Sequence, residues 1–145
     1  MKIAISSDHG GNQLRKEILT LLDELNISYE DFGPQSNDSV DYPDYARPVS
    51  EGVAAGTFDR GILICGTGIG MSIAANKVKG IRCALVHDVF SAKATRAHND
   101  SNILAMGERV IGVGLAREIV ETWLNTEFEG GRHERRVEKI AEIEG

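Results

Sequence analysis

Residues 60–71 read RGILICGTGIGM, an apolar run that passes directly into a glycine-rich loop. The run 60–65 shows no alternation of polar and apolar residues, which is typical of a strand buried on both faces of a parallel sheet. Gly66, Gly68 and Gly70 allow the backbone to turn tightly after that strand. The segment therefore predicts a buried strand, a loop and then a helix, which is the repeating unit of an α/β fold.

Apolar runs elsewhere in the chain predict the other strands of the same sheet. The runs 2–6, 81–86 and 103–106 are predominantly apolar, and 28–32 predicts a weaker strand of edge character. Strands that alternate with helices are joined by right-handed crossovers and form a doubly wound sheet. We therefore expect a three-layer α/β/α sandwich of Rossmann-like type, built on a five-stranded parallel sheet.

Helices are expected where apolar residues recur on one helical face. Two such sets occur along the chain: Leu14, Ile18, Leu21, Leu22 and Leu25, and then Leu115, Ile119, Val120, Trp123 and Leu124. A short C-terminal helix is expected after Gly130-Gly131. Because the chain has no internal repeat or linker, we expect residues 1–145 to form a single domain.

Composition and charge narrow the class of protein. The net charge of −6 argues against a general nucleic-acid binder, although a local basic cluster can still hold a small anion. No apolar stretch approaches the roughly 20 residues needed to cross a bilayer, and the N-terminus lacks the pattern of a signal peptide. Two cysteines form no disulfide framework, so a cytoplasmic location is expected. The histidines are scattered without zinc-site spacing, so we expect no metal.

Cys65 is the main candidate for chemistry, because ligands of such folds bind at the carboxyl ends of the strands. It stands at the start of the glycine loop, whose amides and following helix favour an anion and a thiolate. The opposing interpretation is a small buried hydrophobic residue, which we favour for Cys83 inside its apolar run. A dinucleotide site is disfavoured because Met71 stands where the third glycine is required, and the loop lacks the Lys-Ser or Lys-Thr pair of a Walker loop.

Further polar residues follow the first strand and precede the last one. Asp8 and His9 suit a polar site loop, although an aspartate in this position is also a common helix cap. Histidine transfers protons near neutral pH, which makes His98 a candidate, while Asn99 beside it also suits a helix C-cap. The pair His87-Asp88 is interpreted as a loop or cap.

Basic residues near the C-terminus provide a candidate anion site. Arg132 and Arg136 lie four residues apart and share a helical face, so they either close on one phosphate or form a solvated surface. The segment Gly107–Arg109 ends the last predicted strand and brings another arginine to the carboxyl edge of the sheet.

Taken together, these motifs resemble the ribose-5-phosphate isomerase B family, which also contains galactose-6-phosphate isomerase subunits. The resemblance runs in order over nearly the whole chain and rests on Ser7–Gly11, Asp41–Tyr45, Cys65–Gly70, Ala74–Lys77, His98-Asn99, Gly107–Arg109 and Gly131–Arg136. Where a second branch of the family carries a glutamate base, this chain has Met71, so it resembles the cysteine branch.

The resemblance implies an aldose–ketose isomerase of the pentose phosphate pathway that interconverts D-ribose 5-phosphate and D-ribulose 5-phosphate through an enediolate, without a cofactor. It implies that Cys65 is the base, with the hydroxyl of Thr67 beside it and Asp8 handling hydroxyl protons. The amides of Gly66, Gly68 and Gly70 would stabilise the enediolate oxygen. His98 would open the sugar ring, with Asn99 next to it.

The resemblance also implies a phosphate site and an assembly. The phosphate contacts would be His9, Arg109, Arg132 and Arg136, and the assembly a homodimer or a dimer of dimers with shared sites. His98 and Asn99 would then come from the partner, and neither nucleic acid nor membrane is an expected partner. Two alternatives stay open: an isomerase of allose 6-phosphate or galactose 6-phosphate, and a noncatalytic phosphate-binding α/β module.

Overall fold

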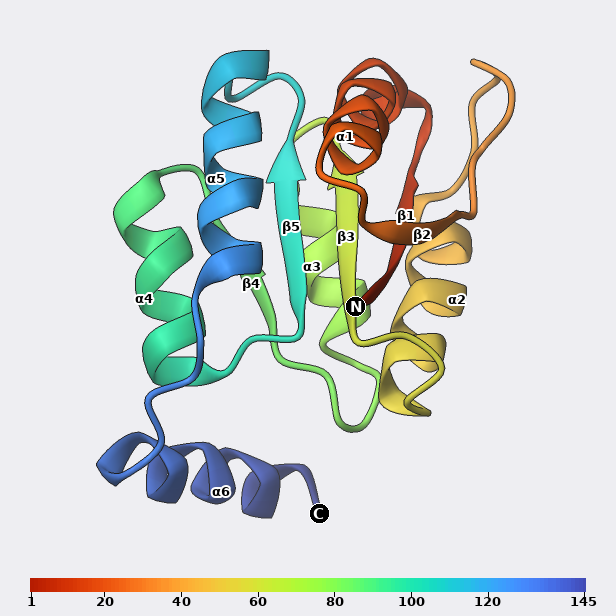
Figure 1. Ribbon diagram of the computed structural model, residues 1–145. Helices are drawn as coiled ribbons and strands as arrows, with labels where there is room; N and C mark the ends of the chain where they lie inside the picture. The colour runs from red at the N-terminus through yellow and green to blue at the C-terminus, as the bar shows by residue number, and fades with distance from the viewer.

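The computed structural model describes all residues from 1 to 145. Its sheet has five parallel strands in the order β2-β1-β3-β5-β4 (Figure 1). The strands are β1 (Lys2–Ser7), β2 (Ser28–Asp31), β3 (Arg60–Cys65), β4 (Cys83–Leu85) and β5 (Ile103–Gly107). The helices are the 3₁₀ turn η1 (His9–Gly11) and α1 (Asn12–Glu24), α2 (Tyr42–Ala54), α3 (Ile69–Ala75), α4 (Val89–Asn99), α5 (Val113–Asn125) and α6 (Arg132–Glu144).

Helices cover both faces of this sheet, which confirms the predicted three-layer sandwich and its Rossmann-like class. One apolar cluster joins α1, α4 and α5 to the sheet and includes Trp123, whose side chain is fully buried. A second cluster joins α2 and α3 to the opposite face through residues such as Val49 and Met71. β3 lies between the two clusters with Ile62, Leu63 and Ile64 completely buried, because its apolar run serves both faces at once.

The register of the sheet brings three strand ends to one edge. Ser7 of β1 pairs with Ile64 of β3, and Cys65 of β3 pairs with Gly107 of β5. The residues that follow β1, β3 and β5 therefore meet at the carboxyl edge, as the sequence predicts for a ligand site.

Three elements differ from their predicted form. β4 has only three residues instead of the run 81–86, because it lies at the sheet edge and pairs with β5 alone; Leu85 is consequently exposed. The C-terminal helix α6 is as long as α1, not short, and packs against α4 outside the layers, below the amino ends of the strands (Figure 1). Helix α2 was not predicted. None of the helices combines the length and the apolar character that crossing a bilayer requires.

Candidate active site

Cys65 is the last residue of β3, and the loop behind it curls over its sulfur. Gly68 adopts the left-handed region with φ of 77°, which turns the loop back so that the Gly68 amide donates a hydrogen bond to Cys65 Sγ at 3.1 Å. The next amide, of Ile69, donates to Thr67 Oγ1 at 3.2 Å. A hydrogen bond from an amide supports negative charge on the sulfur. Although Cys65 is only 5% exposed, it therefore lies in a polar setting rather than a purely apolar one.

The segment Gly107–Arg109 locks this loop from the side of β5. The Arg109 amide donates to the Gly66 carbonyl at 3.0 Å, and the Glu108 amide donates to the Cys65 carbonyl at 2.9 Å. The Arg109 side chain lies beside Gly66, since a Cβ built on Gly66 would be 3.6 Å from Arg109 Nε. The structure thus brings one predicted phosphate-binding arginine next to the predicted base.

Asp8 and His9 reach the same place from β1. The Asp8 amide donates to the Ile64 carbonyl at 3.2 Å, and a Cβ on Gly10 would lie 3.4 Å from the Gly66 amide nitrogen. Asp8 is buried and its carboxylate accepts from the Gly10 amide at 2.9 Å, so it does cap η1, as its structural interpretation predicts. That contact occupies Oδ1 only, so Asp8 can cap η1 and still use Oδ2 in the site.

The exposed His9 ring has a defined tautomer. The Val40 amide donates to His9 Nδ1 at 3.1 Å, so neutral His9 carries its proton on Nε2. The contact also ties His9 to the loop between β2 and α2. That loop is held from below by Arg15 and Asn12, whose side chains donate to the carbonyls of Pro34 and Ser36. Sequence reasoning did not identify Arg15, because a buried arginine within an amphipathic helix carries no signal of its own.

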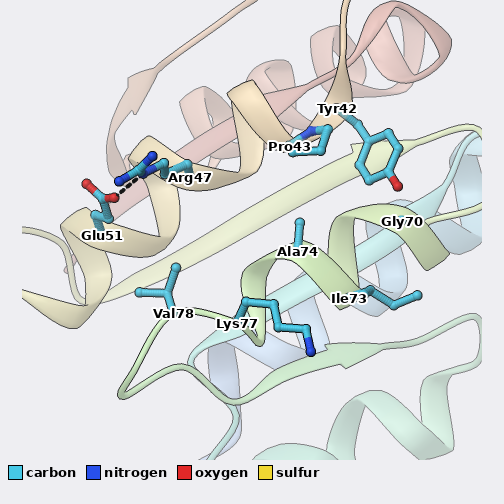
Figure 2. A pocket seen from close by; sticks show the side chains of 9 residues that line it. All are labelled: Tyr42, Pro43, Arg47, Glu51, Gly70, Ile73, Ala74, Lys77 and Val78. Carbon is cyan, nitrogen blue, oxygen red and sulfur yellow. Dashed lines mark hydrogen bonds and ion pairs between the residues drawn. The ribbon is translucent and has the colours of Figure 1, made fainter.

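Tyr42 is a second residue that the sequence left without a role. Its ring covers Gly70, where a Cβ would lie 2.7 Å from Tyr42 Cε1, so a larger residue at this position would displace the ring. Tyr42 and Gly70 stand at one end of the largest cavity of the chain, a groove of about 630 Å³ between α2 and α3 (Figure 2). The floor of this groove includes Ile73 and Ala74, and Cys65 is not among its lining residues. The largest cavity therefore adjoins the candidate site without containing its chemistry.

Three further titratable residues, two after β4 and one at its amino end, have structural roles. Asp88 caps α4 by accepting from the Ser91 amide, which lowers the pKa of its carboxyl, so the cap interpretation of this residue is confirmed. His87 accepts a hydrogen bond from the Gly107 amide through Nε2 at 3.0 Å, and burial lowers its pKa. Cys83 is partly buried against the second apolar cluster, where burial raises the pKa of its thiol to about 12. A thiol that stays protonated has no part in base catalysis.

The remaining predicted residues form a separate cluster around the start of α6. The ring of His98 stacks on that of His133 with centroids 4.3 Å apart, and Glu129 lies beside both histidines. His98 is exposed at the C-terminal end of α4; Asn99, Arg132 and Arg136 are exposed as well. The contact between His98 and His133 was missed, because the two residues are far apart in the sequence and meet only when α6 folds back onto α4.

The two groups of residues lie at opposite ends of the sheet. Cys65 and Gly107 mark the carboxyl ends of β3 and β5, whereas His98 precedes the amino end of β5. β5 has five residues and is therefore roughly 15 Å long. Within one chain His98 does not reach Cys65, so the structure joins Asp8, His9, Thr67 and Arg109 to the Cys65 loop and leaves His98, Asn99, Arg132 and Arg136 apart.

Comparison with known proteins identifies the family to which the chain belongs. The model of the Ribose/Galactose Isomerase family matches residues 3–140. The chain belongs to this family. Membership makes it a sugar-phosphate isomerase of the aldose–ketose type and argues against the noncatalytic phosphate-binding module.

Individual relatives of the family cover the chain almost end to end. The chain is 70% identical to YwlF of Bacillus subtilis, named as a sugar phosphate isomerase, over 99% of this chain and 97% of that one. It is 50% identical to ribose-5-phosphate isomerase B of Escherichia coli, over 99% and 96%. The solved structure of ribose-5-phosphate isomerase B from Clostridium thermocellum superimposes with a TM-score of 0.98 at 57% identity, covering 99% of this chain and 97% of that one.

Gly107 packs closely against the Cys65 loop, so we expect a larger residue at this position to disturb the loop and lower the isomerase rate. A Cβ at this position would lie 2.6 Å from the Thr67 carbonyl carbon, so Gly107→Ala is expected to push the loop aside. Because a misplacement of about 1 Å in an active site can cost 10²-fold in rate, we expect kcat to fall by about 100-fold. Gly114→Ala is the matched control, since a Cβ there meets nothing within 4 Å. Equal isomerase rates for the two folded variants would contradict this prediction.

Proposed function

We propose that this chain interconverts D-ribose 5-phosphate and D-ribulose 5-phosphate, with Cys65 as the base that moves a proton between C1 and C2. The observation that carries the proposal is the hydrogen bond from the Gly68 amide to Cys65 Sγ, at the edge of the sheet where Asp8 and Arg109 also lie. The relatives from Escherichia coli and Clostridium thermocellum, which are named ribose-5-phosphate isomerases, support the choice of sugar.

The reaction requires a base, an oxyanion site and proton carriers for the hydroxyl groups. Starting from the open-chain aldose, the Cys65 thiolate removes the proton from C2, and the electron pair of that bond forms the enediolate. The amides of Gly66 and Gly70 and the Thr67 hydroxyl would stabilise the oxygen on which charge develops, and the Gly68 amide, which donates to Cys65 Sγ in the free chain, would join them once the sulfur is protonated. Asp8 takes the proton of the C2 hydroxyl and returns one to the oxygen on C1, while Cys65 delivers its proton to C1. The step is balanced without a redox cofactor or a metal.

The site is completed, in this proposal, by a second copy of the chain. His98 opens the sugar ring with Asn99 beside it, and both would have to come from a partner, because within one chain they lie at the far end of the sheet. Exposed apolar side chains along α3, β4, α4 and α6 support an interface on this side: Ile69, Ile73, Leu85, Phe90, Ile140 and Ile143. β4 is also an edge strand whose outer side is unpaired.

The phosphate is expected to bind between the two chains. His9 and Arg109 stand beside the Cys65 loop, and Arg132 and Arg136 are exposed at the start of α6. In a two-fold dimer that sets the carboxyl end of one sheet against the amino end of the other, these four side chains would come together. They would form a local positive site on a chain whose net charge is −6. Residues 1–145 would act as one domain, and two free thiols fit a reducing cytoplasm.

A comparison of substrates tests the choice of sugar. We expect the highest kcat/KM on D-ribose 5-phosphate and lower values on allose 6-phosphate and galactose 6-phosphate, which are the alternative substrates. Conversion is followed as ketose formed, together with incorporation of solvent deuterium into the sugar by NMR. Turnover of a six-carbon sugar without turnover of ribose 5-phosphate would replace the proposed substrate. Binding of all three sugars without deuterium exchange would contradict the proton-transfer mechanism itself.

A further inference from the structure

His98, Glu129 and His133 form a compact cluster. Ring opening by His98 does not require the other two residues to lie so close to it. Their three ligand atoms lie within 4.8 Å of one another. The cluster is built by the backbone: the Glu129 amide donates to the Ala97 carbonyl at 3.0 Å, which fixes Glu129 to α4. Positive φ angles of 68° and 58° at Gly130 and Gly131 then reverse the chain, so that α6 places His133 over His98.

One distance within the cluster already fits a tetrahedral metal ion, and a second is close to it. Donor atoms that share one zinc ion at 2.0–2.1 Å lie about 3.4 Å apart. Glu129 Oε1 is 3.5 Å from His133 Nε2, which already matches that separation. Glu129 Oε1 is 3.9 Å from His98 Nε2, about 0.5 Å too far. The two rings are stacked with an interplanar angle of 12°, so the exposed His98 ring has to tilt out of the stack to direct Nε2 at the ion.

The chemistry of the three groups agrees with their geometry. The His133 side chain is buried, and its Nε2 lies 3.5 Å from Glu129 Oε1, so the ring is held with this nitrogen facing the carboxylate. The carboxylate of Glu129 neutralises one of the two positive charges of the ion. This charge is needed because Arg132 and Arg136, on the same helix α6 as His133, would otherwise repel the ion. His98 and Glu129, but not His133, also line a pocket of about 270 Å³ beside Phe90 and Lys93, which leaves space on that side for a water as fourth ligand.

We propose that His98, Glu129 and His133 form a binding site for Zn²⁺, and that an ion bound there inhibits the isomerase by holding His98 away from the sugar. The binding half of this proposal stands on the cluster alone. The inhibitory half rests on the proposed function, in which His98 opens the ring. Two imidazoles and one carboxylate are an established ligand set for zinc, and the ion acts here as an inhibitor, not a cofactor.

Calorimetry with ZnCl₂ tests the binding half without any use of activity. The titrations are made in the Cys65→Ala background, which removes the other metal-binding group of the candidate site. We expect about one ion per chain, and because even outer-shell changes cost 10–100-fold in metal affinity, Glu129→Gln should weaken binding by about 100-fold. Glu127→Gln is the matched control, an exposed carboxylate two residues away that lies outside the cluster. His98→Asn removes a second ligand and is expected to act like Glu129→Gln.

The inhibitory half is tested with the natural Cys65 present. Each variant is compared with its own metal-free rate: ZnCl₂ should inhibit the natural chain and Glu127→Gln equally, and Glu129→Gln only at about 100-fold higher concentration. Equal zinc affinity in Glu129→Gln and Glu127→Gln, or no binding at all, would overturn the site. Binding as expected without inhibition would overturn the role of the ion. A chain with no isomerase activity would end the proposed function, and the calorimetry would still decide the site.

Discussion

Replacing Cys65 with alanine is expected to lower kcat on D-ribose 5-phosphate by about 10²–10⁴-fold, the range that a positioned general base contributes. The affinity for inorganic phosphate should stay within about twofold, because the phosphate contacts come from other side chains. Both quantities are measurable on the same preparation, one as ketose formed and the other by calorimetry. Exchange of the C2 proton with solvent should disappear together with turnover, since the same group carries out both.

Cys83→Ala is the control for this experiment. Its thiol is partly buried and stays protonated, so this variant should keep the turnover and proton exchange of the natural chain. A Cys65→Ala enzyme with near-normal turnover would show that another group is the base. A loss of phosphate binding in that variant would show that the substitution had damaged the loop rather than removed a base.

Mixing two inactive variants should restore activity. Cys65→Ala and His98→Asn each remove a different half of the proposed shared site, so each is expected to be inactive alone on the ring form of the sugar. After subunit exchange, about half of the dimers contain one chain of each kind, and each of these has one intact site out of two, so about a quarter of the natural activity should return. The recovery is measured as turnover against time after mixing.

The expected recovery of about a quarter of the activity depends on His98 acting on the sugar bound at the Cys65 of the other chain. If His98 served the Cys65 of its own chain, every site in the mixture would carry one defect and no activity would return. A mixture of Cys65→Ala with Cys65→Ser provides the matched control, because both variants damage the same half and their heterodimers stay inactive. Recovery in that control would point to contamination or to a residual base.

The layers of the fold were predictable because the chain repeats one pattern. The run Ile62–Ile64 is apolar without interruption, and the structure buries all three residues between two helical layers. β4 was harder to predict, since its apolar run is as long as that of a central strand but only Cys83–Leu85 finds a partner. Edge position depends on which strands come later in the chain, and no local pattern contains that information. The order with β5 inserted between β3 and β4 was unpredictable for the same reason.

Part of the candidate site was also predictable from the sequence, and part was not. Cys65 ends a strand and Asp8 and Arg109 follow strands, so a general rule about strand ends predicts that they lie together. The neighbourhood of His98 and His133 depends on the direction in which α6 leaves Gly131, which is a tertiary property. The role of Tyr42 over Gly70 was hidden for another reason, because a tyrosine at the start of a helix has many uses. Short-range rules thus predict the residues that do chemistry better than those that shape the space around it.

The loop around Cys65 consists mainly of main-chain groups, and this affects how the family can diverge. An amide such as that of Gly68 is present whatever side chain its residue carries, proline excepted, so most mutations can displace this donor but cannot remove it. The rim of the proposed shared site is different, because Tyr42, Asn99 and the arginines would contribute replaceable side chains there. Selection for another sugar is therefore expected to act on the rim, while the proton transfer is inherited unchanged. A new substrate then requires only a few rim substitutions, with no new reaction to evolve.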